Sequence, residues 1–330
     1  MEGIKANPQN AEKTRLYLKK HKLLAERYKV FRKDSFIYFP ITCAPAAADV
    51  KALRRIGAMA VSAEFEPSGS DIPKPPDGLR SGIDLLGNIA IIDADPPMAR
   101  KAASVILSSN KGVTTVLRKG SAVKGVYRKR KYIYVAGKRE YTARYNENGC
   151  SFTFDVRKTF FSPRLAYERK RVADASRNGE NVVVMFAGIG PFAIEIAKKN
   201  PDSNVVAIEL NRAAYGFMRK NASANRVGNV VPLNADVRKV KRKYGRFADR
   251  IVMPLPKDSY DFLDVAEALA KDGCTIHYYA FGDKGSAYDV HSDKILEFFR
   301  KKGRNPRMSF WRVVRPYSPK IIEIVIDFTV

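Results

Sequence analysis

An apolar run at residues 182–186 is followed by two glycines and then by a segment with the spacing of a helix. The run contains three consecutive valines, which is typical of a parallel strand buried on both faces. Gly188 and Gly190 predict a tight turn, and Pro191 predicts the first helical position, where a missing N–H leaves no hydrogen bond unmade. The segment therefore predicts a strand, a glycine turn and a helix whose N-terminus a ligand can approach.

Three further apolar runs predict parallel strands that end in carboxylates or prolines. Residues 205–209 end at Glu209, residues 230–236 end at Asp236, and residues 251–256 end in a pair of prolines. The carboxyl ends of parallel strands share one edge, where open α/β sheets bind ligands, so these residues are expected to line one site. Glu209 is suited to ribose hydroxyls and Asp236 to an adenine amine, which predicts S-adenosylmethionine as the cofactor.

Two alternatives compete with this cofactor site. Gly188, Gly190 and Ala193 also satisfy the relaxed dinucleotide fingerprint. A nicotinamide enzyme, however, has no need for the Asn-Ala-Asp sequence at residues 234–236. The simpler alternative is that Glu209 and Asp236 only cap loops. Two carboxylates at successive strand ends beside one Gly-x-Gly turn favour the cofactor site.

The C-terminal pattern predicts the rest of an α/β domain. A fifth strand is expected at residues 275–280, a helix from about residue 258 to a stop at Gly273, and a helix at 289–302. Residues 311–314 and 321–328 predict a terminal hairpin. Five parallel strands plus an antiparallel pair give the seven-stranded sheet of a class I, Rossmann-like methyltransferase, not the six-stranded dinucleotide fold.

The N-terminal half predicts two small α+β domains ahead of this α/β domain, separated by a proline- and glycine-rich linker. The elements predicted there are helices at 11–27, 44–55 and 98–107, paired strands at 28–31 and 36–41, strands at 89–92 and 114–117, and a hairpin that pairs 132–135 with 141–143. The predicted domains are an N-terminal domain at 1–66, the linker at 67–78, a middle domain at 79–157 and the methyltransferase domain at 158–330.

The charge balance indicates a polyanionic partner. The 330 residues include 60 Lys and Arg against 34 Asp and Glu, a formal net charge of +26. Tyrosines at residues 127–145 are interleaved with one basic cluster, which favours RNA because unstacked bases pack on aromatic rings. A solubility role is the alternative. The sequence lacks a long apolar run, and its cysteines and histidines are scattered, so we expect a cytoplasmic protein without membrane span or metal.

Several motifs together resemble one known family. They are residues 161–165, residues 168–171, residues 186–192 and the Glu-Asn-Gly at 147–149. In this combination the chain is similar to the archaeal-type tRNA (guanine-37 N1)-methyltransferases of the Rossmann class, over nearly its whole length. The resemblance implies tRNA as the partner, with the N-terminal domain on the outer corner and the middle domain on the anticodon arm. A monomer is expected.

The resemblance also implies roles for single residues. Glu168 would be the general base that takes the guanine N1 proton, and Arg128 would hold the base oxygen. This fits the chemistry, because N1 carries a proton and charge moves to O6 as that proton leaves. The residues expected to bind S-adenosylmethionine are Arg169, Phe186, Gly188, Gly190, Glu209, Leu210, Asp236, Val237 and Pro254. From the residues alone, a surface salt bridge between Glu168 and Arg164 or Arg171 is the simpler interpretation.

Three positions depart from the family pattern. The family often has Asp where Val184 stands and His where Tyr145 stands, and its Asn-Leu-Pro after the fourth strand is replaced by Met-Pro-Leu-Pro at 253–256. That version resembles the archaeal branch whose members also methylate C7 of the tricyclic wyosine precursor 4-demethylwyosine. Guanine 37, the tricycle, or both are therefore candidate substrates. Aminocarboxypropyl transfer from the same cofactor, and RNA binding without catalysis, are the other functions left open.

Overall fold

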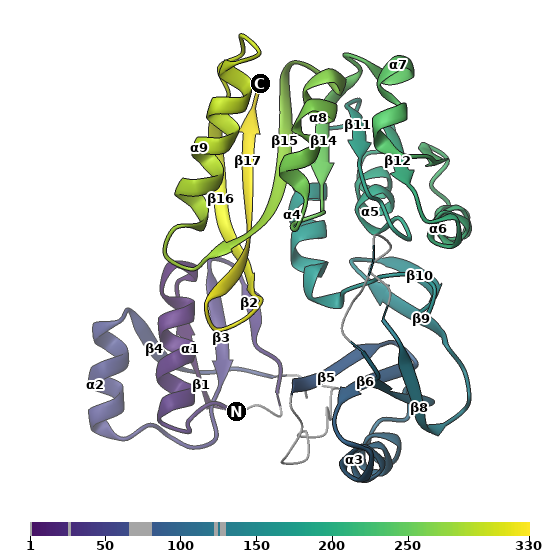
Figure 1. Ribbon diagram of the computed structural model, residues 1–330. Helices are drawn as coiled ribbons and strands as arrows, with labels where there is room; N and C mark the ends of the chain where they lie inside the picture. Colours follow the sequence, from purple (N-terminus) through teal and green to yellow (C-terminus); the bar gives the residue numbers. More distant parts are fainter. Residues whose placement is uncertain (1, 26–27, 66–80, 122–124, 126–129) are drawn as a thin grey trace. The chain divides into compact units, whose positions relative to one another are not determined.

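The computed structural model describes residues 2–25, 28–65, 81–121, 125 and 130–330 (Figure 1). The chain divides into two compact units, residues 1–74 and 75–330. The predicted linker at 67–78 and the predicted catalytic residue Arg128 lie outside the described residues. The candidate site therefore rests on the described part of the second unit.

The first unit is a four-stranded antiparallel sheet with two helices. Its elements are β1 (Glu2–Ala6), α1 (Ala11–Lys20), β2 (Phe31–Lys33), β3 (Phe36–Pro40), α2 (Ala47–Arg55) and β4 (Ala58–Ser62), with sheet order β2-β3-β1-β4. Ile4, Leu18, Phe39 and Leu53 form the centre of its core. A pairing of two strands here was predicted, but the first strand, expected at 28–31, lies at 31–33 and pairs with β3 across a turn at 34–35. Strands β1 and β4 were not predicted from their short apolar runs.

The second unit begins with a four-stranded sheet of order β5-β6-β7-β8. Its elements are β5 (Ser81–Leu86), β6 (Ile89–Asp93), α3 (Pro96–Ser109), β7 (Thr115–Lys119) and β8 (Tyr132–Gly137). Helix α3 connects β6 to the parallel strand β7 and packs on the sheet through Ala99, Ala102 and Ile106. The predicted strands and helix of this region are confirmed.

The predicted pairing of residues 132–135 with 141–143 is wrong. Strand β8 pairs instead with β7, and β9 (Thr142–Glu147) pairs with β10 (Cys150–Asp155). Asn148 and Gly149 join these two strands with φ of +47° and +74°. Two left-handed residues at the centre of a two-residue loop match the twist of a hairpin, so the Asn-Gly pair was the stronger turn signal.

The rest of the second unit is built on a seven-stranded sheet of order β13-β12-β11-β14-β15-β17-β16. Its strands are β11 (Asn181–Val184), β12 (Asn204–Glu209), β13 (Val230–Asn234), β14 (Ala248–Met253), β15 (Ala270–Asp283), β16 (Arg307–Pro316) and β17 (Ile321–Thr329). The first five pair in parallel, and β17 runs antiparallel to both β15 and β16. This confirms the predicted class I sheet, whose order reverses direction at β11.

Helices cover both faces of this sheet. One face carries α4 (Ala166–Ala175), α5 (Pro191–Lys199) and α6 (Arg212–Ala224), and the other carries α7 (Lys241–Tyr244), α8 (Leu263–Leu269) and α9 (Ala287–Arg300). Val182 and Val184 pack toward the first set, and Val183 packs toward the second. Successive strand side chains point to opposite faces, so a strand covered on both sides needs an uninterrupted apolar run.

The predicted helix stop at Gly273 is wrong. Helix α8 ends at Leu269, and Gly273, with a φ of +80°, lies inside β15. The register of β15 against β14 shifts between Ala248 and Arg250, so the strand carries an irregular start there. Gly273 supplies the left-handed conformation for this irregularity rather than for a helix cap.

Candidate active site

The glycine turn after β11 leaves one side of the backbone open. Phe186, Gly188 and Gly190 all have positive φ, and Pro191 occupies the first position of α5 as predicted. A β-carbon on Gly190 would lie 2.9 Å from the Met218 side chain, so only glycine fits there. A β-carbon on Gly188 would have no atom nearer than the Phe160 carbonyl oxygen at 3.9 Å. A ligand can therefore reach the backbone at Gly188.

Glu209 ties the ends of two neighbouring strands together. Its Oε2 accepts a hydrogen bond from the Gly188 N–H (2.8 Å), and its Oε1 accepts one from the Asn211 N–H (2.6 Å). Burial raises the pKa of Glu209 above its usual value. The carboxylate thus caps loops, as the simpler interpretation expected, but it does so against the turn at the carboxyl edge of the sheet.

Asp236 and Phe186 are the two ends of a chain of contacts along the same edge. Asp236 accepts a hydrogen bond from the Arg238 N–H at 2.9 Å, and the Arg238 guanidinium stacks 4.1 Å from the Phe262 ring. Phe262 in turn meets Phe186 edge-on, with ring centres 4.8 Å apart. Of the other predicted cofactor residues, Leu210 is exposed, Val237 is buried and Pro254 is partly buried directly after β14.

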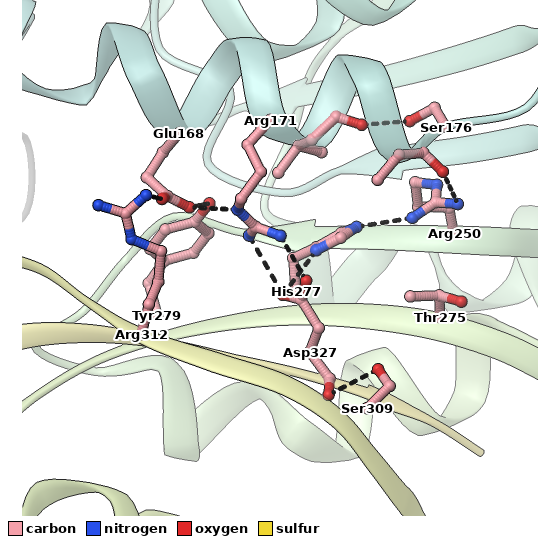
Figure 2. Close-up of polar contacts among 12 residues, drawn as sticks. Glu168, Arg171, Ser176, Arg250, Thr275, His277, Tyr279, Ser309, Arg312 and Asp327 are labelled. Carbon is pink, nitrogen blue, oxygen red and sulfur yellow. Dashed lines mark hydrogen bonds and ion pairs between the residues drawn. The ribbon is translucent and has the colours of Figure 1, made fainter. Parts of the chain in front are cut away.

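Glu168 is buried in the first turn of α4, with only 1% of its surface exposed. Its Oε2 accepts hydrogen bonds from Arg171 Nε (2.9 Å) and from the Tyr279 hydroxyl (3.1 Å), as Figure 2 shows. The pair with Arg171 was expected on the surface and is internal instead. Arg164 does not contribute, because it pairs with Asp84 at 2.7 Å.

Glu168 is linked to the glycine turn through Tyr279. The Tyr279 ring packs against the ring of Phe192, with centres 5.9 Å apart, and Phe192 is the second residue of α5. The structure therefore brings Glu168 toward the same edge of the sheet as Gly188 and Gly190. Glu209 ends β12 and Asp236 follows β13 by two residues, and both strands lie on the other side of β11.

The Arg169 side chain is buried and contacts residues other than the partners of Glu168. Its guanidinium pairs with Glu147 of β9 at 2.5 Å and with Glu195 of α5 at 3.6 Å, and it lies 4.9 Å from the Phe161 ring centre. Asn148, in the hairpin turn, also donates to Glu195 at 2.7 Å. These contacts join the β9–β10 hairpin to two helices of the large sheet. Contact of Arg169 with a cofactor stays a prediction.

The buried carboxyl of Glu195 predicts that stability falls as pH rises. Burial, with Glu147 nearby, raises the pKa of Glu195 to about 8. The unfolded chain loses this proton near pH 4.5, so the folded state holds more protons between those values and stability is lost progressively up to about pH 8. We expect a loss of roughly 2–4 kcal/mol from this group across that window. Urea unfolding at pH 5.5 and 8.5, followed by Trp311 fluorescence, measures it.

A matched control separates this effect from general titration. Glu195→Gln should flatten the pH dependence, whereas Glu297→Gln, which changes an exposed glutamate on α9, should leave it unchanged. An equally steep loss of stability in the Glu195→Gln variant would contradict the assignment.

Sequence reasoning missed a buried polar chain next to Glu168. Arg171 pairs with Asp327 at 2.5 Å, Asp327 contacts His277 Nδ1 at 2.7 Å, and His277 Nε2 contacts Arg250 at 2.8 Å (Figure 2). Arg250 also pairs with Glu180. These residues could have been recognised in the sequence, because Arg250, His277 and Asp327 are polar residues inside otherwise apolar strands.

Among the described residues, no helix is both long and apolar enough to cross a membrane. Within the same ranges, no three His, Cys, Asp or Glu side chains gather where they could hold a metal ion.

The sheet order, the glycine turn and the acidic strand ends define a class I methyltransferase fold. Comparison with known families gives the same class: the TRM5/TYW2 methyltransferase domain matches residues 143–309, and the tRNA methyltransferase 5 N-terminal domain matches residues 3–49. The chain belongs to the TRM5/TYW2 methyltransferase family.

Named relatives span most of the chain. It is 37% identical over 315 residues to the tRNA (guanine(37)-N(1))-methyltransferase Trm5b of Pyrococcus abyssi, covering 93% of this chain and 92% of the relative. It is 33% identical over 251 residues to the tRNA 4-demethylwyosine(37)-methyltransferase Taw21 of Saccharolobus solfataricus, covering 74% and 92%. Among solved structures, the complex of aTrm5 and tRNALeu aligns with a TM-score of 0.68 at 26% identity, covering all of both chains.

Proposed function

We propose that this chain is an S-adenosylmethionine-dependent tRNA methyltransferase that modifies position 37, next to the anticodon, by methylating N1 of guanine. The observation that carries the proposal is Glu168. It is a buried carboxylate with one oxygen held by two donors and the other without a hydrogen bond, on the side of the sheet that bears the glycine turn. A fixed carboxylate with one oxygen that makes no hydrogen bond is suited to accept a proton from a bound base.

The residues at the carboxyl edge fit S-adenosylmethionine. Gly188 leaves its backbone open, Glu209 carries a desolvated carboxylate that suits ribose hydroxyls, and Asp236 is assigned to the adenine amine. Leu210 is exposed beside Glu209 and gives an apolar surface for the adenine ring. Phe186, Gly190, Val237 and Pro254 complete this set, and Arg169 supports it from inside.

Each group of the chain has one task in the reaction. Glu168 takes the N1 proton, so the electron pair of that N–H bond becomes free to attack carbon. Arg128 is assigned to the guanine O6, where negative charge collects. When bound, S-adenosylmethionine supplies the methyl group, and its sulfur keeps the electron pair of the broken bond. The cofactor residues serve to align donor and acceptor, which is the main requirement for transfer from a sulfonium.

Loss of either edge carboxylate should weaken the cofactor complex. We expect Glu209→Ala and Asp236→Ala each to reduce S-adenosylmethionine affinity by roughly 1–3 kcal/mol, the cost of leaving a hydrogen-bonding partner unpaired. Asp202→Ala, just before β12 at the opposite edge of the sheet, is the matched control and should bind normally. Calorimetric titration measures all three, and unchanged affinity in both edge variants would remove the site from this edge.

The roles that we propose for the RNA-binding domains rest on the net charge of the chain and on its family. We propose that residues 1–66 dock on the tRNA, that 67–78 form a linker, that 79–157 hold the anticodon arm and that 158–330 carry out transfer. The net charge of +26 supports phosphate contacts throughout. A monomer acting in the cytoplasm is proposed with these roles.

A second substrate is favoured by one stretch of sequence. From the last residue of β14 the chain reads Met-Pro-Leu-Pro, without the asparagine amide that the family often presents to the substrate. The relative that acts on 4-demethylwyosine is aligned over 74% of this chain. We therefore include methylation of C7 of 4-demethylwyosine at position 37 in the proposal.

Two differently labelled cofactors test the reaction class. Transfer to tRNA of label from the methyl group, and none from the carboxyl group, is the expected result. Label from the carboxyl group would instead show aminocarboxypropyl transfer. No transfer of either label, with tRNA still bound, would leave an RNA-binding protein without catalysis.

A further inference from the structure

The two carboxylate oxygens of Glu168 have different surroundings. Oε2 accepts hydrogen bonds from Arg171 and Tyr279, whereas Oε1 is buried and has no hydrogen-bond partner. The cation nearest to Oε1 in the described contacts is Arg312, with Nη1 at 3.4 Å. Figure 2 shows Arg312 and Arg171 on opposite sides of the Glu168 carboxylate.

Oε2 of Glu168 is bound by Arg171, whose position is fixed by a chain of buried contacts. Arg250 can only donate hydrogen bonds, so His277 Nε2 accepts and the Nδ1–H donates to Asp327, which makes His277 neutral. Asp327 then fixes Arg171 through two contacts, at 2.5 and 3.3 Å. Moving Arg171 away from Glu168 would leave buried charges unpaired along this chain, which is costly.

The Oε1 side is held loosely. Arg312 lies on β16, the last strand of the sheet, and about a third of its side chain is exposed. Its guanidinium stacks 4.4 Å from the ring centre of Tyr167, which is itself 64% exposed. Arg312 is the more exposed of the two cations at Glu168, and Glu168 keeps its contact with Arg171 when Arg312 leaves, so the buried carboxylate is not left without a cation.

We propose that Arg312 is an exchangeable counter-ion of Glu168, which covers Oε1 in the free protein and is displaced by the N1–H of the incoming base. The proton then moves from N1 to Oε1, and Arg312 stays stacked on Tyr167, where an RNA phosphate can take over as its partner. Arg312 is thus a positioning residue for the free protein. The inference rests on the proposed function, because it assigns the proton acceptor to one oxygen of the proposed base.

The test compares the pH dependence of the methyl-transfer rate at limiting and at saturating tRNA. Single-turnover rates are measured from pH 5.5 to 9 with tRNA either limiting or saturating. The limiting regime reports ionisation in the free protein, and the saturating regime reports it in the complex. The charged and titratable groups that face Glu168 are Arg171 on α4, Tyr279 on β15, Arg312 on β16 and, through Arg171, Asp327 on β17.

Arg312→Gln should change the pH dependence of the rate only when tRNA is limiting. With limiting tRNA we expect its rate at pH 6 to fall about 3- to 10-fold further below wild type than at pH 8.5, because loss of a nearby cation favours the neutral acid. With saturating tRNA the pH dependence should match wild type, since Arg312 has already left Oε1. Arg312→Lys keeps a cation and should follow wild type in both regimes.

The control is Arg307→Gln, which removes an exposed arginine from the same strand. It should lower tRNA affinity as much as Arg312→Gln does without changing either pH profile. Unchanged profiles in Arg312→Gln, a shift in both regimes, or a Lys variant that behaves like Gln would each overturn the inference. A wild-type protein with no transfer to guanine 37 would instead contradict the proposed function.

Discussion

Replacing Glu168 with glutamine lowers the single-turnover rate of methyl transfer to guanine 37 by about 10²-fold or more. Glutamine has nearly the same shape, and its carbonyl can still accept from Arg171 and Tyr279. It cannot accept a proton at the position of Oε1, where its amide would face Arg312. S-adenosylmethionine affinity should persist, because Glu168 is not among the residues assigned to the cofactor. Rapid-quench assays with labelled cofactor measure the rate.

Glu323→Gln is the matched control for this variant. Glu323 is also a buried glutamate that pairs with an arginine, Arg315 at 2.6 Å, but it does not contact Glu168 in the contacts described. Its replacement should leave the chemical step near wild type. A Glu168→Gln variant with full activity on guanine 37 would remove this residue from the mechanism. For C7 of 4-demethylwyosine the effect should be smaller, because a carbon nucleophile loses its proton after attack.

Replacing Arg169 with alanine should destabilise the second unit by about 3–5 kcal/mol, the range for removing one partner of a buried ion pair. The variant leaves the Glu147 carboxylate beside Glu195 without its cation, in a site where Arg169 is 1% exposed. It also removes the stacking contact with Phe161. The hairpin β9–β10 should therefore separate from α4 and α5 more readily. Urea unfolding at pH 7, followed by Trp311 fluorescence, gives the difference.

The neighbouring residue supplies the control for Arg169. Lys170→Ala removes a cation from the same helix, but Lys170 pairs with Asp174 at the surface, so a loss within about 0.5 kcal/mol is expected. If Arg169→Ala were as stable as Lys170→Ala and only cofactor affinity fell, the role of Arg169 would be in binding rather than in folding.

The large sheet could be predicted from the sequence because its strands are covered on both faces. Residues 182–184 and 205–208 form uninterrupted apolar runs, and the structure has strands there. The glycine turn and Pro191 fixed the start of α5 for local steric reasons. The same local pattern predicted that Glu209 would end its strand, and it does, whereas the strand predicted to end at Asp236 ends two residues earlier, at Asn234.

Contacts between distant segments could not be predicted in this way. Apart from Arg171, three residues away, the partners of Glu168 come from β15 and β16, more than a hundred residues along the chain. Sequence spacing carries no information on which oxygen each of these two binds. Asp327 and His277 looked like isolated polar residues in apolar strands, although burial makes a partner obligatory. The partner of β8 was also predicted wrongly. The sequence offers one turn between residues 135 and 141 and another at 148–149, and the prediction assigned the hairpin to the wrong one.

Mass spectrometry of nucleosides from treated tRNA shows whether the protein adds a methyl group at position 37. The protein and S-adenosylmethionine are incubated side by side with tRNA that carries guanine at position 37 and with tRNA that carries 4-demethylwyosine there. We expect 1-methylguanosine at position 37 in the first tRNA, and a C7-methylated tricycle in the second if Pro254 marks a site for the larger base. Recovery of both tRNAs without an added methyl group at position 37 would show that the protein is not a methyltransferase for this position.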